Sequence, residues 1–337
     1  MMRSAAFALA LLLLVGCRDE ARGGRAAIRV VGSSTVFPFT AAVAERFVRL
    51  HPDAPAPVVE STGTGAGLRL FCAGIGAAYP DVADASRRIG RAEYDRCAAH
   101  GAGALMEVEI GRDGVAFVRA KDGPDLPLTA ALLYRALAAA PGGRPNRART
   151  WADLDPRLPA TPILVFGPPA TSGTRDALAA LILRRGCAAV EPDLHADAGR
   201  RCTRLREDGV YVDAGENDNG IVQKLRADPQ AIGVLGFGYL RENGGTIAGL
   251  AVDGVAPTYA AIASGRYPGT RPLYLYVKRA HLDAVPRLRE LLRVYAASWS
   301  PDGPLVARGL IPAPAPVRAH AADVVARELP LDRASLR

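Results

Sequence analysis

The sequence is poor in lysine, in aromatic residues and in long apolar runs. Lys121, Lys224 and Lys278 are the only lysines among 337 residues, and aromatic residues make up 6% of the chain. An apolar share of 49% and a charged share of 23% are typical of a globular protein. This composition excludes a disordered chain and a membrane protein with many spans. We find no repeat of about 20–50 residues, which argues against a solenoid or a propeller.

Almost all of the positive charge is arginine, and the formal net charge is +8. A guanidinium fork matches a tetrahedral oxyanion, so an arginine excess suits anion recognition. The arginines are dispersed among acidic residues and form no basic run, so we expect no nucleic-acid partner. A GC-rich genome also encodes many arginines, so this bias alone assigns no function.

The first 17 residues differ from the rest of the chain. An apolar stretch over residues 5–15 is too short to span a membrane. It ends in Leu-Val-Gly-Cys17, which resembles a bacterial lipobox and implies cleavage before Cys17 and lipidation of that cysteine. The alternative is a buried N-terminal helix, but a polar segment follows at once. We therefore expect a signal peptide over 1–16, a tether over 17–26 and a periplasmic protein anchored to a membrane as a lipoprotein.

Four further cysteines follow: Cys72, Cys97, Cys187 and Cys202. An even number in an exported chain favours two disulfide bonds. Three pairings are possible, and proximity in the sequence favours Cys72 with Cys97 and Cys187 with Cys202. A zinc site is the rival interpretation, but there is no CxxC motif and the five histidines lack ligand spacing. We expect no metal and no other cofactor.

Strand-like runs, small-residue loops and helical patterns alternate along the chain. This pattern predicts an α/β fold with a largely parallel sheet, in which ligands bind at the carboxyl ends of the strands. The length allows two domains. We expect the tail after residue 300, which is rich in proline and alanine, to pack loosely. The predicted strands are 28–31, 58–60, 81–84, 105–110, 114–119, 163–166, 231–237 and 271–277, and the predicted helices are 38–50, 68–73, 128–139, 177–185 and 285–297.

Three loops rich in serine, threonine and glycine each precede a predicted helix, at residues 32–36, 62–67 and 171–175. A helix N-terminus offers unpaired N–H groups and a partial positive charge, and hydroxyl groups add donors. Such residues are often only helix caps, so one loop alone is a weak signal. None of the loops has the GK[ST] ending of a P-loop, and the sequence lacks a G-x-S-x-G nucleophile elbow.

The chain contains, in this order, VGSSTVFPF at 31–39, ESTGTGAG at 60–67, DASRRI at 84–89, TSGTRD at 171–176, YVDAGENDN at 211–219, SGRYP at 264–268 and RPLY at 271–274. Taken together, these segments resemble the PstS-like phosphate-binding lipoproteins of ABC transporters over about residues 28–312. The resemblance implies a two-lobed periplasmic binding protein fold of type II, with mixed sheets flanked by helices. The hinge would be crossed near 111–115 and 271–277. Lobe I would comprise 27–112 plus 275–325, and lobe II 113–274.

The same resemblance implies capture of inorganic phosphate by cleft closure and its delivery to the membrane permease of an ABC transporter. The protein would be a monomer and not an enzyme. A binding protein for sulfate, molybdate or arsenate is the alternative, and a phosphatase on the same fold is a further one. The residues that match the family's phosphate loops are Ser34, Thr35, Val36, Thr64, Gly65, Ser172, Gly173 and Thr174.

The sequence departs from the best-known family members at two positions. The aspartate that accepts the proton of hydrogen phosphate aligns with Arg87, and an arginine before Ser-Gly-Thr aligns with Pro168. We therefore assign the guanidinium role to Arg87 and Arg175. At neutral pH phosphate carries a proton and sulfate does not, so a carboxylate that accepts this proton distinguishes the two anions. With Arg87 at the family's aspartate position, another carboxylate must accept the phosphate proton. The candidates for this proton acceptor are Asp176, Glu216 and Asp218.

Overall fold

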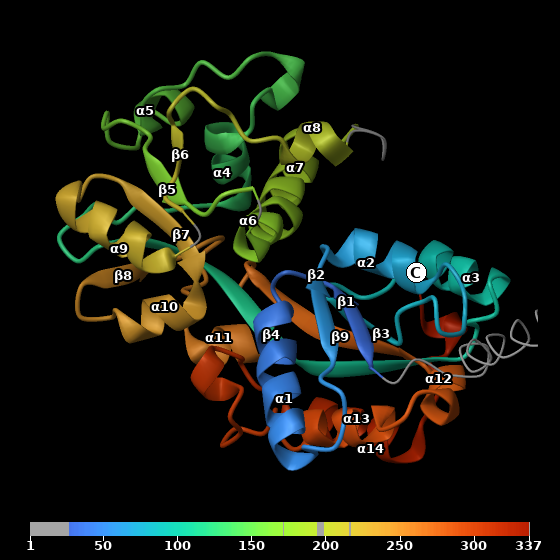
Figure 1. Ribbon diagram of the computed structural model, residues 1–337. Helices are drawn as coiled ribbons and strands as arrows, with labels where there is room; N and C mark the ends of the chain where they lie inside the picture. The colour runs from blue at the N-terminus through green and yellow to red at the C-terminus, as the bar shows by residue number, and fades with distance from the viewer. Residues whose placement is uncertain (1–26, 171, 194–198, 216, 337) are drawn as a thin grey trace, which may run out of the picture.

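The computed structural model describes residues 27–336 except 171, 194–198 and 216. Eight of the nine strands among these residues follow the order β2-β1-β3-β9-β4-β7-β5-β6, and the ninth, β8, pairs with β4. The chain forms two lobes, which separate clearly in Figure 1. The strands are β1 (Arg29–Gly32), β2 (Val58–Ser61), β3 (Val82–Ala85), β4 (Leu105–Ala120), β5 (Val165–Gly167), β6 (Tyr211–Asp213), β7 (Ile232–Gly236), β8 (Ile247–Leu250) and β9 (Thr270–Lys278).

The first lobe is built on β1, which pairs in parallel with β2 and β3, while β9 runs antiparallel to β3. Helix α1 packs in this lobe through one apolar face, on which Phe39, Val43 and Phe47 recur at helical spacing and are buried. The helices of this lobe are α1 (Phe37–Leu50), α2 (Thr64–Phe71), α3 (Arg91–Ala99), α12 (Arg279–Ala284), α13 (Leu288–Ala296) and α14 (Ala315–Arg327).

The second lobe is built on β5, which pairs in parallel with β6 and β7. Its core contains the fully buried Phe117, Tyr134 and Trp151. Residues 178–183 form a π-helical segment between α6 and α7, so one helical run extends from 173 to 190. The helices are α4 (Ala130–Leu137), α5 (Trp151–Leu154), α6 (Gly173–Ala177), α7 (Arg184–Val190), α8 (Gly199–Thr203), α9 (Asp218–Ala227), α10 (Phe237–Glu242) and α11 (Tyr259–Ala263).

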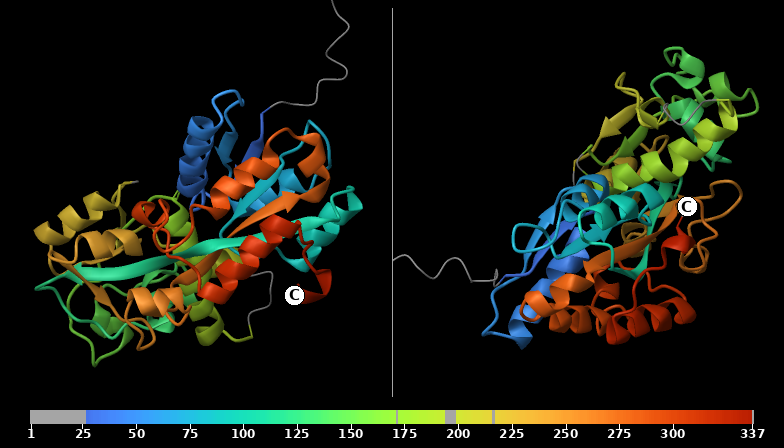
Figure 2. Two further views of the ribbon diagram at one scale, coloured as in Figure 1. Left: turned by 90° about the horizontal axis from the view of Figure 1, so that it is seen from below. Right: turned by 90° about the vertical axis from the view of Figure 1, so that its right-hand side faces the viewer.

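Strand β4 passes from one lobe to the other (Figure 2, left). Its residues 105–114 pair with β9, and its residues 115–119 pair with β7. The prediction of two separate strands, 105–110 and 114–119, was wrong. Pairing with β9 continues between them, since Gly111 pairs with Leu273 and Gly114 pairs with Thr270. The sheets are accordingly mixed, and both ladders between β4 and its neighbours β7 and β9 are antiparallel.

The prediction of a loosely packed tail was also wrong. Helix α14 packs against β4 and buries Ala321 and Val324 (Figure 2). Before it, the N–H of Ile311 donates to the carbonyl of Arg112 at 3.0 Å, and the Arg112 N–H donates back at 2.7 Å. After it, Leu336 is 2% exposed in the core of the first lobe. Alanine and valine at helical spacing supply the apolar face that the proline-rich composition obscures.

Two disulfide bonds join Cys72 to Cys97 and Cys187 to Cys202, which is the pairing that sequence proximity favours. Two helices begin earlier than predicted, at Thr64 and Gly173, so the small-residue loops already form their first turns. Within the described residues, no helix is long and apolar enough to cross a membrane.

Candidate functional site

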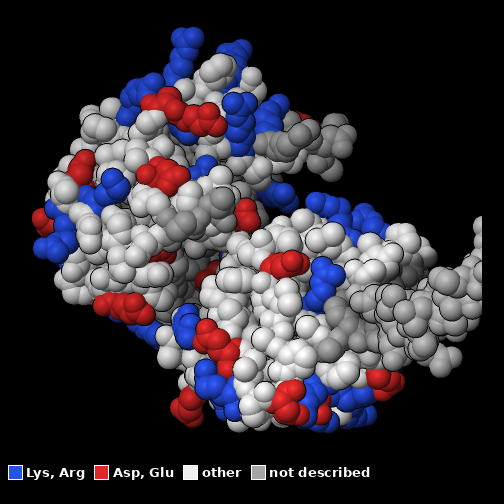
Figure 3. Space-filling view, in the orientation of Figure 1, with Lys and Arg blue, Asp and Glu red and all other residues white. Residues whose placement is uncertain are grey.

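The lobes enclose a cleft of about 730 Å³, and the surface is hollowed between them in Figure 3. Loops from both lobes reach this cleft at helix N-termini, as the sequence pattern predicts for an anion site. Three acids also line the cleft: Asp218 was a sequence candidate, whereas Asp113 and Glu242 were not. The cleft is also lined by Ser34, Thr35, Ser172, Gly173, Thr174 and Arg308.

The first loop connects β1 to α1 and is fixed from behind. The N–H of buried Ser33 donates to the carbonyl of Asp84 at 2.9 Å, and the Ser33 hydroxyl accepts the N–H of Thr35 at 3.2 Å. These bonds leave Ser34 and Thr35 facing the cleft. Val36 is fully buried in the core of the first lobe, so its side chain serves packing.

The second loop lies directly beside the first. The N–H groups of Thr62 and Gly63 donate to the carbonyl of Gly32 at 2.9 and 2.8 Å. A Cβ at Gly67 would lie 2.4 Å from the Gly32 Cα, so only glycine allows α2 to approach this closely. Thr64 accepts the N–H of Ser86 at 3.1 Å and thereby ties α2 to β3. Thr64 and Gly65, which the sequence suggested as phosphate contacts, do not belong to the cleft lining.

The third loop meets the first across the cleft. The Ser172 hydroxyl caps α6 by accepting the N–H of Thr174 at 3.2 Å. A Cβ on Gly173 would lie 2.1 Å from the Thr35 hydroxyl oxygen and 3.0 Å from that of Ser34. The two lobes therefore touch at Gly173, with no space for a side chain between the loops.

Both arginines that the sequence suggested are engaged elsewhere. Arg87 forms a fork with Glu93 at 2.7 and 2.8 Å, which raises the pKa of Arg87, and its side chain is 49% exposed. The Arg175 guanidinium lies 4.2 Å from the centre of the Tyr211 ring and donates to the carbonyl of Pro168 at 3.3 Å. Neither arginine lines the cleft.

Arg271 also lies outside the cleft lining, whose arginine is Arg308, but its guanidinium reaches both loops, and the sequence interpretation missed it as a site residue. Its Nη2 donates to the Gly173 carbonyl at 2.8 Å, to the Asp113 carboxylate at 3.2 Å and to the Thr35 hydroxyl. The side chain is 5% exposed, and burial lowers the pKa of Arg271 while Asp113 opposes that shift. The only signal in the sequence was its place in the RPLY segment.

The three candidate proton acceptors have different surroundings. Asp218 lines the cleft, is 6% exposed and accepts the N–H of Gly236 at 2.9 Å. Asp176 lies on helix α6, exposed and outside the cleft lining; desolvation raises its pKa, while Arg271 and Arg175 oppose the shift. Glu216 lies outside the described residues.

Behind the first loop lies a further acid that the sequence did not single out. Asp84 is 1% exposed, and burial raises its pKa to about 8, although a hydrogen bond from Thr40 at 2.8 Å opposes the shift. Its Oδ1 has no hydrogen-bond partner. Across the described ranges, no three histidine, cysteine or acidic side chains are grouped so that they would hold a metal ion.

Two lobes joined by long strands, with Ser/Thr loops at helix N-termini on both sides of one cleft, define a solute-binding protein of the periplasmic type. Residues 19–297 match the family model of the PBP superfamily domain, and the chain belongs to that superfamily. Its PstS-like phosphate-binding members are the ones it resembles, which confirms the predicted family and fold class.

Relatives support this assignment. The chain is 32% identical to Protein SphX of Synechococcus elongatus over 77% of its length and 70% of that protein. It is 26% identical to the phosphate-binding protein PstS of Staphylococcus saprophyticus over 81% of its length and 78% of the relative. A possible phosphate binding protein from Planctomyces limnophilus has a similar structure, with a TM-score of 0.70, 28% identity and coverage of 90% of this chain and 98% of the other. The latter two carry names of binding proteins, not of enzymes.

Proposed function

We propose that this protein captures inorganic phosphate in the cleft between its lobes and releases it unchanged. The observation that carries the proposal is the meeting of two hydroxyl-bearing loops, one from each lobe, at Thr35 and Gly173. Each loop precedes a helix, and the hydroxyl-bearing Ser34, Thr35 and Thr174 line the cleft, where their hydroxyls can donate to the oxygens of one tetrahedral anion. Arg271 adds the positive charge beside them.

Selectivity for phosphate over sulfate would come from the acidic side of the cleft. Hydrogen phosphate carries a proton that a carboxylate accepts, whereas sulfate would place two acceptors against each other. An unpaired buried polar group costs about 1–3 kcal/mol, which corresponds to roughly 10- to 100-fold in affinity. We assign the proton acceptor to Asp218, because it is the sequence candidate that the cleft lining includes.

Closure and delivery complete the proposal. The lobes would bend where β4 and β9 pass between them, near residues 111–115 and 271–277, with the lobe boundaries that the sequence suggested. The closed, loaded form would deliver phosphate to an ABC permease, because a conformational difference is what a partner can recognise. Lipidation of Cys17, which lies outside the described residues, would keep the protein outside the cytoplasm and close to that permease.

Calorimetry on the mature chain tests this function. We expect phosphate to bind with a micromolar or lower Kd that a tenfold excess of sulfate does not change. Asp218→Asn should lower the preference for phosphate over sulfate at least tenfold, whereas Asp283→Asn, whose side chain is 87% exposed on α12, should leave it unchanged. Absence of binding would refute phosphate capture, and displacement by sulfate would indicate a general oxyanion site.

A further inference from the structure

We propose that Arg271 is the positioning residue that couples anion binding to the relative placement of the two lobes, an inference that rests on the proposed function. Arg271 lies on β9, directly across from Asp113 on β4. These are the strands that run between the lobes. From this position the guanidinium reaches Thr35 of the first lobe and the Gly173 carbonyl of the second.

The donors of this guanidinium are used unevenly. Nη2 has two hydrogens but three acceptors, namely Thr35, Gly173 and Asp113, and Nε makes one long bond of 3.3 Å to Asp113. No described residue accepts a hydrogen bond from Nη1. The charge is almost completely buried, and its paired carboxylate is 3.2 Å away. A largely buried guanidinium whose Nη1 has no acceptor among the described residues, beside two loops that line the cleft, has the properties needed to bind an anion.

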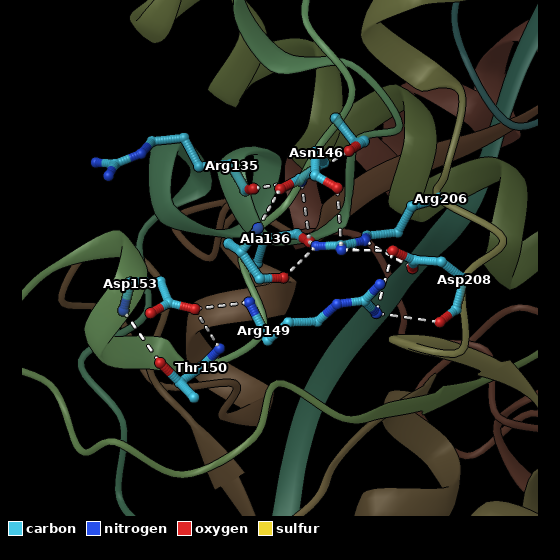
Figure 4. A network of polar contacts seen from close by, with 10 residues as sticks. Arg135, Ala136, Asn146, Arg149, Thr150, Asp153, Arg206 and Asp208 are labelled. Atoms are coloured by element: carbon cyan, nitrogen blue, oxygen red, sulfur yellow. Dashed lines mark hydrogen bonds and ion pairs between the residues drawn. The ribbon is translucent and has the colours of Figure 1, made fainter.

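Arg206 shows how a purely structural arginine is bound in the same protein (Figure 4). Its side chain is 3% exposed, and all three nitrogens are engaged. Nε and Nη2 donate to the Asp208 carboxylate at 2.8 and 2.6 Å. The other donors bond the carbonyls of Ala136, Ala148 and Asn146. Arg206 thus makes five hydrogen bonds with five N–H groups, away from the cleft lining, whereas Nη1 of Arg271 has no acceptor among the residues that the structure describes.

The consequence is a defined route from binding to motion. An anion that accepts from Nη1 and from the hydroxyls of both loops would add a fourth partner to the contact that holds Thr35 near Gly173. Binding would then stabilise the arrangement in which the loops touch. Without the guanidinium, the loops could each contact the anion, but no group would connect them through the hinge strands.

The test compares Arg271→Met and Arg271→Lys with Arg206→Met as the control of equal burial. Phosphate affinity is measured by calorimetry. The distance between the lobes is measured with dyes on Ala56→Cys and Ala160→Cys, two exposed positions, one on each lobe, with and without phosphate. We expect Arg271→Met to weaken phosphate binding about 10- to 100-fold and to abolish the distance change at saturating phosphate.

The variants separate coupling from simple structural damage. Arg271→Lys keeps the charge without the planar fork, so it should recover part of the affinity but not the distance change. Arg206→Met should lower the stability and leave the Kd within about threefold, because its bonds lie outside the cleft. If Arg271→Met does not fold, Arg271→Lys alone decides the matter by the same two measurements.

Two results would overturn the coupling. One is an Arg271 variant that closes on phosphate as the unmodified chain does. The other concerns the free protein and remains measurable even if the unmodified chain binds no phosphate, an outcome that separately refutes the proposed function. Arg271 bonds both Thr35 and Gly173, so even in that case the dye distances of the free protein must shift in Arg271→Met. An unchanged distribution would show that Arg271 does not tie the lobes together.

Discussion

The contact between the two loops predicts the effect of one added methyl group. In Gly173→Ala, the Cβ would lie 2.1 Å from the Thr35 hydroxyl oxygen and 2.7 Å from the Thr35 nitrogen, where ordinary contact begins at 3.4 Å. Thr35 cannot retreat easily, because Ser33 and Arg271 hold it. The loops must therefore separate by about 1 Å, a displacement that costs up to about 100-fold in a positioned site. We expect calorimetry to show a 10- to 100-fold loss of phosphate affinity.

Stability would not account for that loss. Gly173 is the first residue of α6, where alanine is a better helix former than glycine by about 0.5–1 kcal/mol. The matched control is Gly238→Ala on α10, which lines the same cleft but whose Cβ would meet only the Gly309 Cα at 3.6 Å. A Gly173→Ala protein that binds phosphate within threefold of the unmodified chain would refute the contact, and so would an equal loss in the control.

Three further changes have defined outcomes. Burial raises the pKa of Asp84 from its usual 3.8 to about 8, so the free energy of unfolding should decline as the pH rises from about 4 to about 8. In urea unfolding, Asp84→Asn should therefore become more stable relative to the unmodified chain at pH 8 than at pH 5. The same stability difference between the two proteins at both pH values would contradict the raised pKa. Replacing Cys187 and Cys202 by alanine opens a loop of 15 residues and should lower the unfolding free energy by about 3 kcal/mol in the same assay. Arg87→Ala should change phosphate affinity less than about threefold in calorimetry, because Glu93 already occupies that guanidinium; a larger loss would return Arg87 to the site.

Local patterns in the sequence predicted the parts of the fold that depend on neighbours in the chain. The apolar spacing of Phe39, Val43 and Phe47 gave helix α1 within one residue of its observed start. The small-residue loops identified both sides of the cleft, because helix starts need donors and close approach needs glycine. Their first turns were assigned to the loops, since serine, threonine and glycine are typical of both helix caps and turns.

Features that depend on distant contacts escaped the sequence. The glycines between 111 and 114 read as a break, but pairing with β9 on the far side of the chain keeps β4 continuous. The proline and alanine of the tail read as loose packing, although α14 finds an apolar surface on β4 that no local pattern reveals. In both cases, tertiary partners decided the structure over local propensity.

The arginines show the same division in the site itself. Arg87 follows strand β3 and approaches the loops, but its guanidinium forms an ion pair with Glu93, six positions further along the chain. Arg175 lies within the third loop, and Tyr211 covers its guanidinium. The arginine that reaches both loops is separated from Thr35 by 236 positions and from Gly173 by 98. A cation on the strands that join the lobes contacts both sides at once, whereas a cation within either loop moves with that loop alone. If anion binding sets the relative placement of the lobes through such a cation, the cation lies far in the sequence from the loops it contacts, and local motifs do not predict its position.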